Sequence, residues 1–247
     1  MNEAIPGVGA SPCIRISGLA KHFRLYRDGN SDGEIPTEIP VFGGLSLDVH
    51  PGECVVLAGA SGVGKSTLMR AIYGNYLPSD GSVRVLHDGA WIDIAACLPR
   101  QLLEVRRRTL GYVSQFLRVI PRITTLQLVM EPLLENGVAA DVAEARARII
   151  LEKLRLPERL WSLPPATFSG GEQQRVNIAR SFVSERPVML LDEPTASLDA
   201  ANRETVVALI HEALARGAAM VGIFHDADVR DAVATLLFDV ESFRHAA

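Results

Sequence analysis

One glycine-rich segment constrains the fold of this chain more than any other part of its sequence. Residues 59–67 fit the pattern G-x-x-x-x-G-K-[ST]. The apolar run at 53–58 before them predicts a buried strand, and residues 65–75 after them predict a helix. A glycine turn between a strand and a helix lets backbone N–H groups surround a phosphate. The segment therefore predicts a nucleotide-phosphate site within an α/β fold.

The chemistry of such a cradle assigns a role to its charged and hydroxyl groups. Lys65 would reach the β- and γ-phosphates, and the Ser66 hydroxyl would ligate Mg²⁺. The alternative is an accidental glycine-rich turn, which the strand–turn–helix order disfavours. The candidate phosphate-binding residues are Gly59, Ala60, Ser61, Gly62, Val63, Gly64, Lys65, Ser66 and Thr67.

A second apolar run, residues 188–191, ends in two acidic residues. Ligands of open α/β sheets bind where the carboxyl ends of the strands meet. Asp192 is placed there to hold Mg²⁺ through its water shell, and Glu193 to orient or deprotonate a water molecule. A solvated strand end is the alternative, but the cradle makes a magnesium–nucleotide site the better interpretation.

The remaining apolar patterns alternate between strand and helix at both ends of the chain. This alternation predicts an α/β fold with a mostly parallel sheet covered by helices. Residues 27–40 read as a Gly/Pro/Asp-rich loop. The expected strands lie at 14–16, 45–49, 82–86, 91–94, 110–114, 218–224 and 236–240, and the expected helices at 98–108, 124–136, 141–155, 171–184 and 200–216.

Two local patterns carry further expectations. On the helix at 141–155, Val142, Ala145 and Ile149 fall on one side, and Arg146 and Lys153 on the other. The basic run at 106–108 could be a nucleic-acid patch. A solvated helix end is favoured, because cations suit a helix C-terminus and no aromatic residues are interleaved with the arginines.

Composition excludes several classes of protein. The net charge of -4 argues against a chain built mainly to coat nucleic acid, so we expect no nucleic-acid partner. No apolar run approaches the ~20 residues of a membrane-spanning helix. Three widely spaced cysteines indicate free, mostly buried thiols in a reducing compartment. Residues 1–12 read as a loose leader without a secretory pattern, so we expect a cytoplasmic protein.

Residues 168–175, Phe-Ser-Gly-Gly-Glu-Gln-Gln-Arg, resemble the signature motif of ATP-binding cassette (ABC) ATPases. Other pieces follow in that family's order: Gln115 resembles its Q-loop glutamine, residues 197–199 its D-loop and His225 its switch histidine. Taken alone, Gln115 or His225 would more often be a structural residue, and residues 169–171 a helix N-cap. The resemblance covers residues ~20–230.

The resemblance implies a P-loop NTPase of ABC type that occupies residues 13–247. Its parallel core sheet would carry an antiparallel β subdomain and a helical subdomain at about 98–184. ATP and Mg²⁺ would be its cofactors, and the metal would be bound by Ser66, Gln115 and Asp192. Glu193 and His225 would be catalytic. Phe23 would stack on adenine, with Tyr26 as second choice. The remaining implied nucleotide contacts are Ser169, Gly170, Gly171, Glu172 and Asp199.

The resemblance also implies a partner. The signature of one subunit would face the phosphates held by another subunit's cradle, in a head-to-tail homodimer or in a heterodimer with a related ABC subunit. A second surface, Phe116, Leu117, Val119, Ile120 and Pro121 beside Arg118 and Arg122, would by analogy contact a further partner. The alternative for these apolar residues is half-buried core.

Longer stretches, at 113–122, 156–161, 167–180 and 216–226, resemble ATP-binding subunits of bacterial phosphonate carbon–phosphorus (C–P) lyase systems. The resemblance implies that the chain acts together with the other C–P lyase subunits. The step with which it is associated forms α-D-ribose 1-methylphosphonate 5-triphosphate from ATP and methylphosphonate. The alternative is the ATPase subunit of an ABC membrane transporter. Three departures from the transporter pattern favour the first: Glu172, Phe224 and a single strand after His225.

Overall fold

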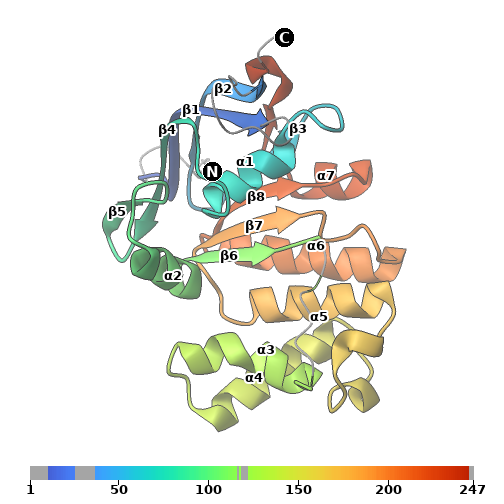
Figure 1. Ribbon diagram of the computed structural model, residues 1–247. Coiled ribbons are helices and arrows are strands. Elements are labelled where there is room, and N and C mark those ends of the chain that lie inside the picture. Colours follow the sequence, from blue (N-terminus) through green and yellow to red (C-terminus); the bar gives the residue numbers. More distant parts are fainter. Residues whose placement is uncertain (1–10, 26–36, 116, 118–121, 245–247) are drawn as a thin grey trace, which may run out of the picture.

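The computed structural model describes residues 11–25, 37–115, 117 and 122–244, and contains two β-sheets (Figure 1). The core sheet is parallel, in the order β6-β7-β8-β3-β9. The second sheet is antiparallel, in the order β2-β1-β4-β5. The strands are β1 Ile14–Leu25, β2 Thr37–Val49, β3 Cys54–Ala58, β4 Asp80–His87, β5 Ala90–Asp93, β6 Leu110–Val113, β7 Val188–Asp192, β8 Ala219–Ile223 and β9 Leu236–Asp239.

Helices cover the core sheet on both sides. In Figure 1, α1 lies between the core sheet and the antiparallel sheet, α5 and α6 lie below the core sheet, and α3 and α4 form the lobe beneath them. This arrangement confirms the predicted fold class. The helices are α1 Lys65–Ile72, α2 Pro99–Arg108, α3 Thr125–Glu135, α4 Ala140–Lys153, α5 Gly170–Phe182, α6 Ala200–Ala215 and α7 Ala227–Val233, with short 3₁₀ turns at Glu158–Leu160, Pro165–Thr167 and Glu241–Phe243.

The core strands are buried on both faces, so their side chains feed two separate apolar cores. In β7, Val188 and Leu190 pack with α1 and the antiparallel sheet, whereas Met189 and Leu191 pack with α3–α6. Alternate residues of a strand point to opposite faces, which is why one short run serves both layers. The sheet therefore separates α1 from α5.

Two boundaries predicted from sequence are wrong. Residues 37–40 were expected in a loop, but they form the start of β2, where Ile39 pairs with Phe23. Pro40 is compatible with this strand because β2 is an edge strand and needs fewer backbone donors. The helix expected at 65–75 ends at Ile72, because Gly74 then adopts a left-handed φ of +77°. The rest of the expected loop, 27–36, lies outside the described residues.

The apolar side identified on helix α4 is also wrong. Val142, Ala145 and Ile149 are exposed, and Ile149 is 63% exposed. The buried positions are instead Ala143, Ala147, Ile150 and Leu151, which pack in the core shared by α3 and α5. The helix carries apolar residues on two sides, and the side with two small alanines fits closest to its neighbours.

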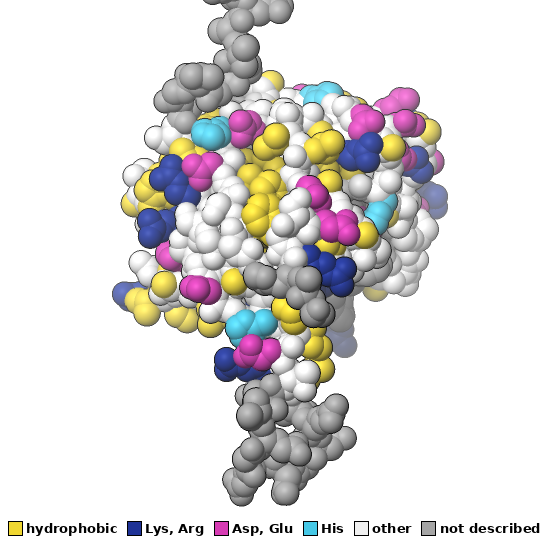
Figure 2. All heavy atoms as spheres, turned by 90° about the horizontal axis from the view of Figure 1, so that it is seen from above, with side chains coloured by type: hydrophobic (Ala, Val, Ile, Leu, Met, Phe, Trp, Pro, Cys, Tyr) yellow, Lys and Arg dark blue, Asp and Glu magenta, His cyan; other side chains and the backbone are white. Residues whose placement is uncertain are grey.

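The basic run at 106–108 forms structural contacts. The Arg106 guanidinium donates to the Tyr73 carbonyl, and Arg107 and Arg108 pair with Glu104 and Asp88. Figure 2 shows the face of the molecule seen from above, where acidic and basic side chains intermingle without forming one basic patch. All three cysteines are free, and two of them are buried. Among the described helices, none is long and apolar enough to cross a membrane.

Candidate nucleotide site

The glycine-rich segment forms a turn between β3 and α1. Gly59, Gly62 and Gly64 all have positive φ, the region that favours glycine. A Cβ added at Gly64 would lie 2.6 Å from Cγ1 of Val41, so this position cannot carry a side chain without rearrangement. Gly64 is also the N-cap of α1, and among the described residues no side chain caps this helix end. The first N–H groups of α1 are therefore available for an anion.

Lys65 folds back over the turn. Its Nζ donates to the carbonyl oxygens of Gly59 and Ala60, at 2.7 and 2.8 Å. The Ser66 side chain is exposed, whereas the Val63 side chain is 2% exposed and packs in the core. Val63 can therefore offer a phosphate only its backbone. Free N–H groups, a lysine and a hydroxyl fit a phosphate group with Mg²⁺.

Asp192 lies at the carboxyl end of β7. In the core sheet, β8 lies between β7 and β3, the strand that precedes the glycine-rich turn. Its residue exposure is 5%, and its Oδ2 accepts a hydrogen bond from the Tyr112 hydroxyl at 2.7 Å. Burial raises the pKa of Asp192, and the hydrogen bond from Tyr112 opposes that shift. Burial and the same hydrogen bond raise the pKa of Tyr112, so the hydroxyl keeps its proton and remains a donor.

Glu193 joins two residues that lie far apart in the sequence. Its Oε1 lies 2.7 Å from Nε2 of His225, and its Oε2 accepts from the side-chain amide of Gln115 at 3.2 Å. The Glu193 backbone has a φ of +53°, and its N–H donates to the Ile223 carbonyl. A non-glycine residue in this region is costly and is typical of functional sites. The strand end thus brings three of the predicted residues together.

The signature segment forms the N-terminus of α5. Ser169 is the N-cap, and its Oγ accepts from the Glu172 N–H at 3.4 Å. The Glu172 carboxylate closes the capping box by accepting from the N–H and the hydroxyl of Ser169, at 2.9 and 2.7 Å. These bonds lower the pKa of Glu172. The N-cap alternative is therefore correct for Ser169 in this single chain.

The D-loop segment packs directly on the signature. A Cβ at Gly171 would lie 2.9 Å from the carbonyl oxygen of Ser197, whereas one at Gly170 would meet nothing within 4 Å. Asp199 caps α6, because its Oδ1 accepts from the N–H and the side-chain amide of Asn202. Gly170 thus leaves open space at the start of α5, and Gly171 fixes the neighbouring turn.

Comparison with known proteins identifies the family. A family model described as "ABC transporter" matches residues 42–196. The chain belongs to the ABC transporter ATPase family. Members of this family bind ATP, typically with Mg²⁺, and their cassettes function as dimers. The dimeric structure of the bacterial ABC transporter cassette MJ0796 superimposes with a TM-score of 0.80 at 27% identity, covering 92% of this chain and 95% of that chain. A second MJ0796 structure is a dimer in a post-hydrolysis state, bound to ADP and Pi.

Curated relatives of this ABC cassette come from several bacteria. The lipoprotein-releasing system ATP-binding protein LolD of Pseudomonas syringae is 39% identical over 74% of this chain and 79% of that protein. The uncharacterized ABC transporter ATP-binding protein YvrO of Bacillus subtilis is 34% identical over 87% of this chain and 88% of its own length. The macrolide export ATP-binding/permease protein MacB 1/2 of Paracoccus denitrificans is 37% identical, but the chain spans only 30% of it.

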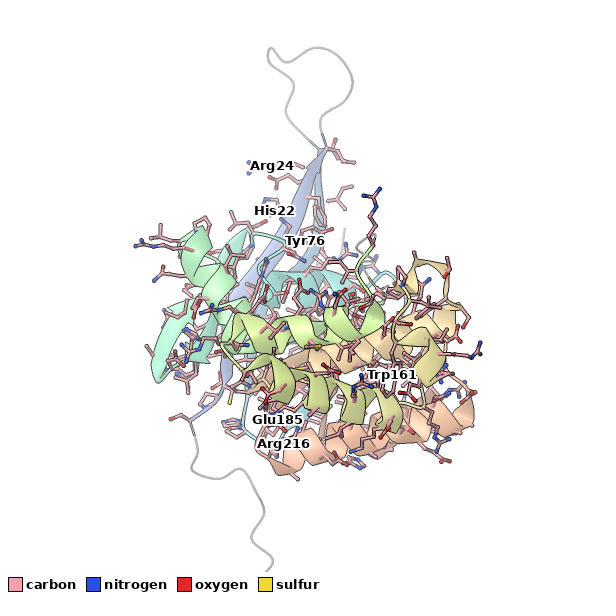
Figure 3. All side chains as sticks on the ribbon, turned by 90° about the horizontal axis from the view of Figure 1, so that it is seen from below. His22, Arg24, Tyr76, Trp161, Glu185 and Arg216 are labelled. Atoms are coloured by element: carbon pink, nitrogen blue, oxygen red, sulfur yellow. The ribbon has the colours of Figure 1, made fainter. Side chains whose placement is uncertain are left out.

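The candidate adenine platform of the cassette lies on strand β1. Phe23 is half-buried, Lys21 Nζ lies 4.8 Å from its ring centroid, and Tyr76 meets it edge-on at 5.6 Å. Tyr76 lies at the foot of the β1–β2 ribbon, below His22 and Arg24 in the view of Figure 3. Tyr76 belongs to no motif, so this contact could not be predicted from the sequence. Tyr26 lies outside the described residues.

A cavity of about 740 Å³ opens beside the cassette's Gln115, between the edge strand β6 and helices α1, α2, α3 and α5. Its lining includes Tyr112 and Asp192. Of the predicted partner surface, Leu117 lines this cavity and is half-buried against the core. Of the other residues in that prediction, Arg122 is exposed, and Phe116, Arg118, Val119, Ile120 and Pro121 lie outside the described residues.

Proposed function

We propose that this chain is the ATP-hydrolysing subunit of a larger assembly and that it acts as a head-to-tail dimer. The arrangement of Glu193 carries the proposal. Its carboxylate is held between Gln115 and His225, directly after the buried carboxylate of Asp192. A carboxylate oriented from both sides at the end of a core strand suits a group that positions water for attack on a phosphate.

The residues divide into binding and catalytic groups. Lys65 and the N-terminus of α1 would hold the phosphates, and Ser66, Asp192 and Gln115 would hold Mg²⁺, which supplies charge neutralisation. Glu193 would orient the water and take its proton. His225 would stabilise the charge that develops on the phosphate.

The placement of α1 and α5 on opposite faces of the core sheet supports the proposed dimer. Helix α1, which carries the cradle, packs on one face, and helix α5, which carries the signature, packs on the other. A second subunit can bring its own α5 N-terminus to this cradle, and Gly170 leaves the room for close approach. The dimeric MJ0796 cassette supports this proposal.

Replacement of Glu193 by Gln tests the catalytic part of the proposal. The amide keeps the shape but cannot accept a proton, so we expect turnover to fall about 100-fold or more while ATP stays bound. Radiolabelled phosphate release and nucleotide binding would be measured on the same preparation. Glu204→Gln is a matched control, because Glu204 is exposed on α6. Wild-type hydrolysis in Glu193→Gln would contradict the assignment.

Two assemblies are candidates for the partner, and the relatives support the membrane transporter, given above as the alternative, better than the C–P lyase complex. The relatives named above favour a membrane transporter, since their names include lipoprotein release and macrolide export. The stretches at 113–122, 156–161, 167–180 and 216–226 favour the C–P lyase complex, because they resemble PhnL, its ATP-binding subunit. In that case the chain would take part in making α-D-ribose 1-methylphosphonate 5-triphosphate.

Purification of the tagged chain from its own host, followed by mass spectrometry, separates the two. The host would be grown once with phosphate and once with methylphosphonate as phosphorus source. Lyase subunits recovered with the chain under methylphosphonate would support the phosphonate pathway. Recovery of membrane permeases under both conditions would support a transporter instead. The tagged Glu193→Gln variant serves as bait, because we expect it to retain ATP and thereby to stay in the proposed head-to-tail dimer.

A further inference from the structure

The carboxylate expected at the metal has a hydrogen-bond partner that no sequence motif indicates. The Tyr112 hydroxyl donates to Oδ2 of Asp192 at 2.7 Å, where Asp192 is buried and Tyr112 is half-buried. In the described part of the structure, this is the hydrogen bond that the Asp192 carboxylate accepts. We propose that Tyr112 is a positioning residue that holds Asp192 in the orientation required for Mg²⁺. The inference rests on the proposed function, because it assumes that Asp192 serves the metal.

Tyr112 is itself fixed by its surroundings. It lies on β6, paired in register with Leu190 of β7, so its backbone is tied to the same strand that carries Asp192. Its ring packs against the Tyr73 ring, with centroids 4.9 Å apart. The Arg106 guanidinium lies over the Tyr73 ring at 4.3 Å and donates to the Tyr73 carbonyl. A hydroxyl anchored in this way offers its proton from a constant direction.

The hydrogen bond has a consequence for metal binding. A carboxylate at the end of a side chain can rotate, and only some orientations present an oxygen to a metal's shell. The hydrogen bond from the Tyr112 hydroxyl to Oδ2 limits this rotation and leaves the other lone pairs of the carboxylate for that shell. Groups that orient a metal-binding side chain in this way typically contribute about 10–100-fold to metal affinity. Tyr112 also keeps a buried carboxylate hydrogen-bonded while no metal is present.

The substitution Tyr112→Phe isolates the hydroxyl, because the aromatic ring that packs on Tyr73 is retained. We expect the Mg²⁺ concentration for half-maximal nucleotide binding to rise about 10-fold or more. Binding of a fluorescent ADP in EDTA should stay within about twofold of wild type, because the phosphate cradle is untouched. Both titrations would use the full-length purified chain. Tyr73→Phe is the matched control, because in the described part of the structure the neighbouring hydroxyl that it removes forms no hydrogen bond with Asp192. Its Mg²⁺ titration should match wild type.

Combining Tyr112→Phe with Asp192→Asn tests whether the effect of Tyr112 on Mg²⁺ binding is purely structural. If Tyr112 acts through Asp192, adding Tyr112→Phe to Asp192→Asn should change the Mg²⁺ requirement no further. An unchanged Mg²⁺ titration in Tyr112→Phe would overturn the inference, even if the variant melted at a lower temperature. An equal additional loss in the Asp192→Asn background would overturn it as well. Failure of the wild-type chain to bind nucleotide would instead overturn the proposed function.

Discussion

The N-termini of helices α1 and α5 differ in whether a side chain engages their first residues. Helix α1 begins at Gly64, with a left-handed backbone and, among the described residues, no side chain on its first N–H groups. Helix α5 begins at Ser169, whose hydroxyl and N–H are both engaged by Glu172. The first terminus is open to an anion, and the second is closed by its own capping box.

The difference indicates how the composite site proposed above would remain inactive in a single subunit. The first backbone N–H groups of an open terminus can bind a phosphate without first displacing a side chain, because among the described residues no side chain caps them. A closed terminus has to release its serine hydroxyl before it can donate to a phosphate on another subunit. The cradle should therefore bind nucleotide in the monomer, and the signature should contribute only in the dimer.

Removal of Lys65 should have the largest effect, because it acts on the open terminus. Its Nζ makes two hydrogen bonds to carbonyls of the turn and would carry those donors to the phosphates. Hydrogen bonds to charged groups contribute about 1.5–3 kcal/mol each, so we expect Lys65→Ala to weaken ATP binding about 100-fold or more. Calorimetric titration of the monomer measures this loss.

Lys153→Ala is the matched control for that measurement. Lys153 pairs with Glu212 on the surface of the helical side, far from the turn in sequence, and its loss should leave nucleotide affinity unchanged. Equal affinities for Lys65→Ala and wild type would show that the α1 terminus is not the nucleotide site, and the comparison of the two helix ends would lose its basis.

The two glycines of the closed terminus give a matched pair of intermediate effect. A Cβ at Gly171 would meet the Ser197 carbonyl at 2.9 Å, so Gly171→Ala should lower the free energy of unfolding by about 1–3 kcal/mol. A Cβ added at Gly170 would meet open space in the monomer, so Gly170→Ala should not lower the free energy of unfolding. That variant should instead impair ATP-dependent dimerisation, as measured by light scattering. Normal dimerisation of Gly170→Ala would show that the two subunits do not approach closely at α5.

The sequence predicted the elements that depend on local backbone chemistry. The glycine turn and the buried strand at 188–191 follow from residue types whose conformational needs are strong, and so does the Ser169 cap, which the sequence offered as an alternative. The wrong side of α4 has a different cause. Both sides of that helix carry apolar residues, and only the fit of Ala143 and Ala147 against neighbouring helices decides which side is buried.

The contacts of Tyr112 and Tyr76 were out of reach for a related reason. Each depends on a pairing between residues distant in sequence, Tyr112 with Asp192 and Tyr76 with Phe23. Helix α7 did carry a local signal that was missed: Asp226 accepts from the N–H groups of Asp228 and Val229 as an N-cap. An aspartate after a buried strand, followed by a short apolar period, would have indicated it.

The smallest predicted effect concerns the capping box of α5 and its dependence on pH. Hydrogen bonds from Ser169 favour the charged Glu172, so its pKa is lowered in the folded state. A lowered carboxylate pKa adds stability that is fully present above the unfolded pKa of about 4.3 and is lost as pH falls through the folded pKa. Glu172→Gln cannot titrate, so the stability difference between wild type and this variant should shrink as pH falls below about 4.

Urea denaturation at several pH values measures this difference. Because Glu172 lies at the surface and is only half-buried, the effect should be small and weakened by salt. Glu204→Gln, a substitution at an exposed residue of α6 outside the capping box, provides the control. A stability difference for Glu172→Gln that stays constant with pH would mean that the box does not depend on the carboxylate charge. The closed terminus would then be held by the Ser169 hydroxyl alone, and a subunit could open it without displacing a charged group.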